Sequence, residues 1–151
     1  MTVGLGDGNF GGSGLQPHDG AKGKKIFVLL NNGSSGEYLT AKTTSRGDRY
    51  GIQYGCQILE RFPNFYFVRG SCFLKDNTWV QLDAFYEFGA ADLLQKVMSN
   101  HIKRIGVIDT AQMAQLLTCA SHAEDLTQHQ ESIVNETMAD IRSSKPQSVA
   151  S

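Results

Sequence analysis

Apolar side chains recur at alternate positions through much of residues 26–88, which is typical of β-strands. The run Ile26–Leu30 is apolar throughout and predicts a short strand covered on both faces. Glu37–Thr43 predicts a weaker strand. Tyr50–Ile58 alternates between apolar and uncharged polar residues, which favours a half-buried strand over a helix, because its two glycines would weaken a helix.

The most regular pattern belongs to two segments that follow each other closely, Phe65–Leu74 and Thr78–Phe88. The short connection Lys75–Asn77 contains an aspartate and an asparagine, which suit turn conformations. The pattern therefore predicts a β-hairpin. Both of its faces carry large side chains, since Trp79 and Phe85 lie on the face opposite the more continuous apolar row.

From Gly89 onward the apolar spacing changes to that of helices. The apolar stripes of three predicted helices are Leu93, Leu94, Val97 and Met98; Met113, Leu116 and Leu117; and Leu126, Ile133, Val134, Met138 and Ile141. Asp109 or Thr110 can cap the second helix, and Ser121–Glu124 fits a capping box that would begin the third. Arg104–Ile108 predicts a short strand between the first two helices.

Together these elements predict one α+β domain, in keeping with a length of 151 residues. We expect an antiparallel sheet of about five strands, open or curled into a small barrel, followed by about three helices that cover one face. The domain spans residues 24–142, β-rich over 24–88 and helical over 89–142. Residues 1–23, which hold eight of the 16 glycines, predict a flexible arm, and residues 143–151 predict a disordered tail.

Charge is balanced overall but uneven along the chain. Fourteen Lys and Arg against fifteen Asp and Glu give a net charge of −1, which excludes a protein that coats polyanions by bulk charge alone. Residues 22–61 carry a net charge of +4, whereas residues 109–151 carry −4. A basic β half and an acidic helical half therefore share one chain, which bears on the choice of partner.

The cellular compartment is expected to be a reducing one. The longest apolar run, Ile26–Leu30, is too short to span a membrane, and no signal peptide is visible. Three cysteines, an odd number, argue against a disulfide framework. We therefore expect a cytoplasmic protein, or a subunit of a particle assembled in the cytoplasm, with no membrane partner.

Aromatic residues are concentrated in the hairpin: nine of fourteen lie between positions 62 and 88. Because a two-sided hairpin cannot turn all of them towards one core, we expect one sheet face to contact another protein subunit. The expected interface residues are Phe65, Phe67, Trp79 and Phe85, together with Phe10 and Leu15, which would anchor the arm on a neighbouring subunit.

The alternative interpretation is a platform on which single-stranded nucleic acid stacks. In that case Trp79 would stack on a base. The residues expected to contact phosphates are Lys24, Lys25, Lys42, Arg46, Arg49 and Arg69. No RNA-recognition signature accompanies them, so the protein interface is favoured.

Motifs for cofactors and metals are weak. Gly6–Gly11 matches the pattern GxGxxG, but a dinucleotide site needs a strand before this motif and a helix after it. Cys119, His122 and His129 lack the spacing of a zinc site, so we expect two solvated histidines and a buried thiol. No cofactor and no metal ion are predicted.

Catalysis is not predicted either. Cys56 and Cys72 lie in expected strands, where a cysteine is usually a small buried apolar residue, and no GxSxG or HExxH motif is present. We therefore expect a non-catalytic structural or assembly protein within a larger homo- or hetero-oligomeric complex, such as a viral or phage particle. Single-stranded nucleic-acid binding is the alternative, and a small enzyme is a distant third.

Overall fold

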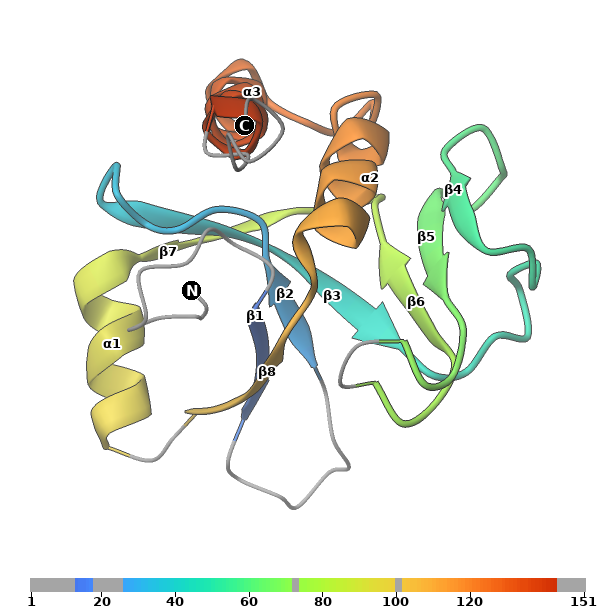
Figure 1. Cartoon of the computed structure of the whole chain (residues 1–151), viewed down its shortest axis with the longest axis horizontal. Coiled ribbons are helices and arrows are strands. Elements are labelled where there is room, and N and C mark those ends of the chain that lie inside the picture. Colours follow the sequence, from blue (N-terminus) through green and yellow to red (C-terminus); the bar gives the residue numbers. More distant parts are fainter. Residues whose placement is uncertain (1–12, 18–25, 72–73, 100–101, 144–151) are drawn as a thin grey trace, which may run out of the picture.

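The computed structural model describes residues 13–17, 26–71, 74–99 and 102–143 of the chain, which form an α+β fold (Figure 1). The elements are β1 (Ser13–Pro17), β2 (Phe27–Leu29), β3 (Glu37–Thr44), β4 (Gly55–Gln57), β5 (Asn64–Phe67), β6 (Thr78–Gln81), β7 (Tyr86–Gly89), α1 (Ala90–Met98), β8 (Ile102–Val107), α2 (Thr110–Ala120) and α3 (Gln128–Ser143). The strands form an antiparallel sheet in the order β4-β5-β6-β3-β2-β1-β8, and β7 also pairs with β3. The predicted α+β class is confirmed, and the sheet is open rather than closed into a barrel.

The longest strand, β3, organises the sheet. β7 pairs with residues 37–40 of β3, and β6 pairs with residues 43–44 along the same edge, while β2 lies along the other edge. The strand predicted over Thr78–Phe88 is therefore two strands. Residues 82–85 separate β6 from β7: the Leu82 N–H donates to the carbonyl oxygen of Pro63, which extends the β5–β6 pairing by one residue, and regular pairing resumes only at Tyr86.

The central strand pairing of the predicted hairpin is confirmed. Phe65 of β5 lies opposite Val80 of β6, and Tyr66 lies opposite Trp79. Its strands are shorter than expected, since β5 ends at Phe67 and a longer connection leads to β6.

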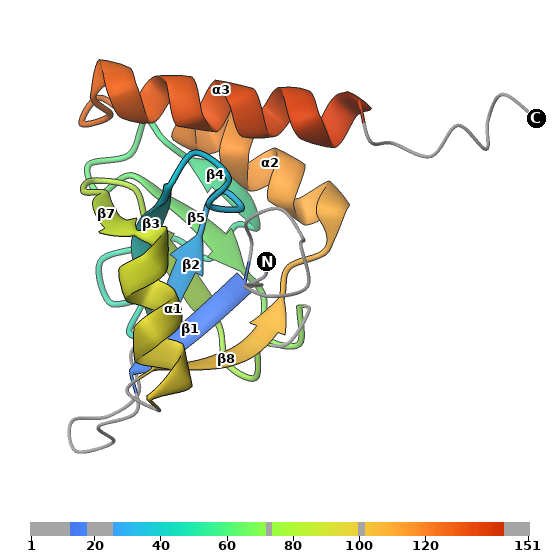
Figure 2. The same ribbon diagram turned by 90° about the vertical axis from the view of Figure 1, so that its left-hand side faces the viewer.

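Both faces of the central sheet are covered by helices. Val28 and Leu39 pack in the main core with α2 and α3, whereas Leu29 and Tyr38 pack with Leu93 of α1. Alternate residues of one strand point to opposite faces, so the prediction that the run beginning at Ile26 is covered on both faces is confirmed. The expectation that all helices cover one face is wrong: α2 and α3 lie together, and α1 lies apart from them (Figures 1 and 2).

The strand predicted over Tyr50–Ile58 is mostly absent. Only Gly55–Gln57 pairs, as β4, and the side chain of Ile52 is 77% exposed. Gly55 has a φ of 104°, a conformation that interrupts an extended strand, so the alternating pattern does not correspond to one pleated face.

α1 and α2 begin where the sequence predicts, and two other expectations need correction. Asp109 caps α2, since its carboxylate accepts a hydrogen bond from the Gln112 N–H at 2.8 Å. The capping box predicted at Ser121–Glu124 is wrong, because α3 begins only at Gln128. On α1, Leu93 is buried as expected, but Leu94 and Met98 are exposed. No described helix is long and apolar enough to cross a membrane.

Part of the expected N-terminal arm belongs to the sheet. Leu15 lies in β1, whose backbone pairs with Phe27 of β2 and with β8. The boundary expected at residue 23 therefore falls after a strand of the domain, and Leu15 is not on a free arm. Phe10, the other expected anchor, lies outside the described residues, as does the tail after Ser143.

Candidate functional site

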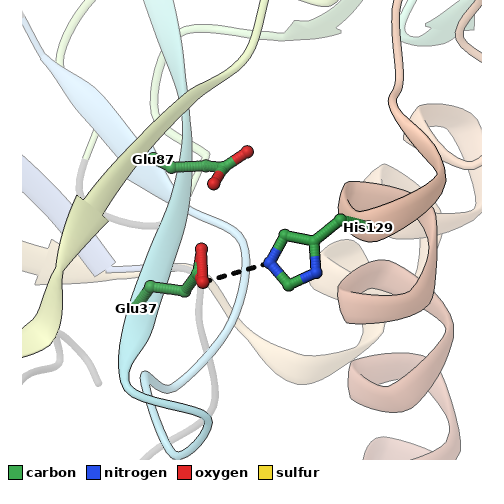
Figure 3. Close-up of side chains that lie close together, drawn as sticks. All are labelled: Glu37, Glu87 and His129. Carbon is green, nitrogen blue, oxygen red and sulfur yellow. Dashed lines mark hydrogen bonds and ion pairs between the residues drawn. The ribbon is translucent and has the colours of Figure 1, made fainter.

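Two glutamates and a histidine from three elements meet at the start of α3 (Figure 3). The Nε2 atom of His129 lies 3.0 Å from Oε2 of Glu37 on β3. The ligand atoms of Glu37, His129 and Glu87 on β7 all lie within 4.8 Å of one another. Glu37 is half-buried, and the other two side chains are exposed. We call Glu37, Glu87 and His129 the Glu–Glu–His cluster.

The register of β3 and β7 positions the two carboxylates. Glu87 lies opposite Leu39, and Glu37 lies opposite Gly89, so the glutamates are diagonal neighbours on one face of the sheet. Asn31 fixes this end of β3: its side-chain amide donates to the carbonyl oxygen of Glu37, and its side-chain oxygen accepts from the Leu39 N–H, both at 2.9 Å.

The start of α3 positions the histidine. Thr127 and Gln130 form a capping box, in which each side chain accepts the backbone N–H of the other residue at 3.0 Å. The Nε2 atom of Gln130 also donates to Oε2 of Glu87 at 2.8 Å. Gln130 is only 6% exposed, so a buried side chain joins the first turn of α3 to β7 and places His129 beside Glu37.

Hydrogen bonds within the cluster shift two pKa values. The bond with His129 is the main cause that lowers the pKa of Glu37. The bond with Glu37 raises the pKa of His129, and the negative charges of Glu37, Glu87 and Glu136 add to this effect. Sequence reasoning missed the cluster, because Glu37 and His129 are 92 residues apart and no local motif links them.

The aromatic residues of the hairpin pack against one another within a single chain. Trp79 stacks with Tyr66 and with Tyr50, with ring centroids 4.8 and 6.0 Å apart. Its indole N–H donates to the carbonyl oxygen of Gly51 at 2.8 Å, and Gly47 lies directly against its ring. Trp79 is only 4% exposed, because residues of its own chain cover it.

The residues expected at a protein interface mostly lie in the core. Phe65 and Phe67 are fully buried, Trp79 is nearly so, and Phe85 is partly buried against the main core. In this conformation, Phe65, Phe67 and Trp79 do not offer an exposed surface to a partner or a ring face to a base. The physical reason is that the segment after β3 and the helix α2 cover the aromatic hairpin from within the chain.

The basic residues expected at a nucleic-acid site are distributed over several places. The Nζ atom of Lys42 lies 4.8 Å from the ring centroid of Tyr86, across β3 and β7. Arg69 is exposed in the connection after β5, where its backbone N–H donates to the side chain of Asn77. Lys24 and Lys25 lie outside the described residues.

Arg49 and an unpredicted arginine form a local basic group. The guanidinium groups of Arg49 and Arg61 lie 4.8 and 5.3 Å from the ring centroid of Phe62, which packs edge-on against Tyr50. Arg46 is exposed in the same segment. None of these three arginines has an ion-pair partner within the described part of the chain, so their charges face solvent.

A disulfide joins β4 to α2 through Cys56 and Cys119. The expectation that these two residues are free thiols is therefore wrong, and the odd cysteine count concealed one pair. Cys72 lies outside the described residues. Because disulfides persist mainly in oxidising compartments, the bond weighs against the reducing compartment expected from the sequence.

A cavity of about 560 Å³ lies beside the disulfide. Tyr54 and Gln115 form part of its lining, and they are joined by a hydrogen bond of 3.0 Å. His122 also lines it, with Nδ1 lying 2.9 Å from the carbonyl oxygen of Thr118. No carboxylate is found among its described lining residues, so the cavity does not bring together an acid and a histidine for general acid–base chemistry.

The connection between β3 and β5, residues 45–63, shows large apolar side chains to solvent. Leu59 is 95% exposed and Ile52 is 77% exposed, and Tyr54 is partly exposed. We call residues 45–63 the loop segment. Sequence reasoning missed it as a surface because it assigned Ile52 to the apolar face of a strand.

Comparison with known protein families found none that matches the chain, and comparison with characterised proteins found no similar sequence.

Proposed function

We propose that this protein is a non-catalytic assembly protein that associates with further copies of itself in a larger complex, such as a viral or phage particle. The observation that supports the proposal is the loop segment. It exposes Ile52 and Leu59, although its backbone is held in place by the domain. The proposed interface is therefore this segment. It replaces the interface that the sequence predicted on the hairpin aromatics, which are buried.

The loop segment is fixed at several points. Trp79 donates to the carbonyl oxygen of Gly51, and the amide of Gln81 donates to the hydroxyl of Tyr50 at 3.1 Å. The disulfide of Cys56 attaches the segment to α2, and the hydroxyl of Tyr54 bonds to α2 as well. A surface that is already ordered loses little conformational entropy on binding, which favours association.

Exposed apolar side chains on this segment supply the driving force. Single exposed apolar residues are common on proteins, but large ones held in a fixed loop are candidates for contact with a partner. Each leucine or isoleucine that becomes buried contributes roughly 1.5–3 kcal/mol to association. Ile52 and Leu59 are therefore expected to be central to the contact.

The charge distribution supports a second copy of the chain as the partner. Arg46, Arg49 and Arg61 outnumber the exposed Asp48 and Glu60 of the loop segment, and each of these arginines lacks an ion-pair partner in the described structure. The outer face of α3 exposes Glu131 and Glu136, and Asp140 as well. A basic surface on one copy can thus contact an acidic helix on the next, which produces head-to-tail association.

Native mass tests this proposal. The full-length wild type should form oligomers whose mass rises with concentration in multi-angle light scattering, and Leu59→Asp and Ile52→Asp should both reduce that mass, because a buried unpaired carboxylate is costly. Both substitutions should leave the melting temperature nearly unchanged, since both side chains are exposed. Met98→Asp, at an exposed position on α1, is the matched control and should leave the mass unchanged.

Charge reversal tests the orientation of the contact. Arg49→Glu with Arg61→Glu should prevent association, and so should Glu131→Lys with Glu136→Lys. A mixture of the two variants should associate again, because the reversed charges are complementary across one type of contact. A wild type that stays monomeric at every concentration, or Met98→Asp disrupting as strongly as Leu59→Asp, would contradict the proposal.

Single-stranded nucleic-acid binding is retained as a second candidate because two arginines without an ion-pair partner among the described residues flank Phe62. In that case an oligonucleotide should bind with an affinity that falls steeply with salt concentration, and Arg49→Glu with Arg61→Glu should abolish the binding. Trp79 fluorescence should stay unchanged on binding, since Trp79 is buried. If the oligonucleotide does not bind at low salt, the candidate is removed.

The Cys56–Cys119 disulfide bears on where assembly takes place. Assembly in an oxidising compartment accounts for the bond directly. For a particle assembled in the cytoplasm, as the cysteine count led us to expect, the bond would have to form later, after release into oxidising surroundings. Thiol titration of the protein purified from each compartment distinguishes these two routes.

A further inference from the structure

We propose that the Glu–Glu–His cluster is a binding site for a divalent transition-metal ion of the Zn²⁺ type, held by one carboxylate from β3, one carboxylate from β7 and the imidazole of α3. This site is distinct from residues 45–63 of the proposed assembly contact, although His129 lies on α3, the helix proposed to receive that segment from a neighbouring copy.

The geometry of the three side chains is compatible with one ion. Metal–ligand bonds of about 2.0–2.2 Å place two ligand atoms of a tetrahedral zinc ion about 3.3–3.5 Å apart. Nε2 of His129 and Oε2 of Glu37 are 3.0 Å apart, and the ligand atoms of all three residues lie within 4.8 Å of one another. Glu87, which is exposed, is the third member of the set (Figure 3).

Buried neighbours hold the ligands in place. Gln130, at 6% exposure, donates to Glu87 at 2.8 Å, and its own orientation is fixed because its oxygen accepts the Thr127 N–H. Asn31, at 4% exposure, holds the backbone of Glu37 through its side-chain amide. Metal sites characteristically have such an outer hydrogen bond to a ligand carboxylate, as Gln130 supplies to Glu87.

The donor set favours a transition metal over magnesium or calcium. Mg²⁺ and Ca²⁺ prefer oxygen ligands only, whereas imidazole nitrogen suits Zn²⁺ and its neighbours in the first transition row. Three protein ligands with access from solvent leave a fourth position for water. Because the ligands come from β3, β7 and α3, a bound ion would attach the first turn of α3 to the sheet.

Isothermal titration of the full-length protein, stripped with a chelator, tests the site with Zn²⁺ as the probe. One saturable site per chain is expected, and binding should raise the melting temperature. Co²⁺ should give a visible absorption band that the addition of Zn²⁺ removes. His129→Ala and Glu87→Gln should each weaken Zn²⁺ binding by at least about tenfold.

Two controls separate this site from other surface groups. His122→Ala removes an exposed histidine near the end of α2, and Glu131→Gln removes an exposed carboxylate on α3 outside the cluster. Both should bind Zn²⁺ as the wild type does. The proposal is overturned if Zn²⁺ does not bind saturably, or if binding persists unchanged when Glu37→Gln, Glu87→Gln and His129→Ala are combined. Circular dichroism of each variant shows whether it is folded. If His129→Ala fails to fold, the affinity of Glu87→Gln decides.

Discussion

The indole nitrogen of Trp79 donates a hydrogen bond to the carbonyl oxygen of Gly51 at 2.8 Å, which attaches the loop segment to the centre of β6. The same indole ring is covered by Gly47, because a Cβ atom at that position would lie 2.2 Å from a ring carbon. The sequence predicted Trp79 to be exposed at an interface. In the structure Trp79 is instead buried and packs beneath the loop segment.

Replacing Gly47 by alanine should destabilise the protein. The added methyl group has no space against the Trp79 ring, so the loop must shift, at a cost of about 1–3 kcal/mol. Gly51→Ala is the matched control, because a Cβ there meets no atom within 4 Å, and it should be close to neutral. Urea unfolding of both variants measures the difference. Equal stability of the two would show that Gly47 is not in contact with Trp79.

Replacing Thr127, which caps α3, should lower the free energy of unfolding more than replacing Ser121, the cap that the sequence predicted. Thr127→Ala removes a side-chain acceptor of the capping box and should lower the unfolding free energy by about 1 kcal/mol. The hydroxyl of Ser121 donates to the carbonyl oxygen of Thr118 and lies 3.3 Å from Nδ1 of His122, and neither contact caps α3, so Ser121→Ala should stay within about 0.5 kcal/mol of the wild type. Denaturant unfolding ranks the two, and a larger effect at Ser121 would contradict the capping assignment.

The two capping candidates illustrate how far the sequence could predict the fold. Ser121–Glu124 and Thr127–Gln130 both place a hydroxyl three residues before a long side chain, so local chemistry does not choose between them. The structure chooses the second, in which Gln130 also bonds to Glu87 on β7. The prediction at Ile26–Leu30 was correct because an unbroken apolar run has one interpretation, whereas the choice between the two capping boxes is accompanied by a contact with a distant strand.

The candidate sites depended even more on distant contacts. The partner of Cys56 is Cys119, 63 residues later in the sequence, and an odd number of cysteines gave no sign of the pair. Arg61 could have been identified from its neighbour Phe62, since an arginine beside an aromatic residue suits stacking. No comparable sequence signal exists for the Glu–Glu–His cluster, which only the pairing of β3 with β7 and the docking of α3 create.

Reducing the disulfide should destabilise the domain. The bond joins β4 to α2 across 63 residues of chain, and removing such a bond costs about 2–4 kcal/mol, largely by loosening the unfolded state. Cys56→Ser with Cys119→Ser should show this loss in urea unfolding, and reductant should have no further effect on that variant.

Thiol titration counts the free cysteines and so tests whether the disulfide is formed. Unfolded but unreduced wild-type chains should expose one reactive thiol, since the sequence has three cysteines and the bond uses Cys56 and Cys119. After reduction the count should rise to all three. Three thiols before reduction would show that the pair is open in the purified protein.

The hydrogen bond between His129 and Glu37 should give the stability a defined pH dependence in metal-free protein. The pKa of His129 is raised in the folded chain, so its contribution is fully present below the ordinary histidine value of about 6.5 and is lost as the pH rises through the folded-state pKa. The pKa of Glu37 is lowered, so its contribution is present above about 4.3 and is lost as the pH falls through the folded-state pKa.

The pair should therefore stabilise the fold most between about pH 4.3 and 6.5. The difference in unfolding free energy between the wild type and His129→Gln, measured with chelator present, should be largest in this window and should shrink on both sides of it. Glu87 and Glu136 also face His129, so part of the effect should remain when Glu37 alone is changed. In a Glu37→Gln background, His129→Gln should have a smaller and flatter effect. An effect of His129→Gln that is independent of pH, or the same in both backgrounds, would show that the two side chains are not coupled.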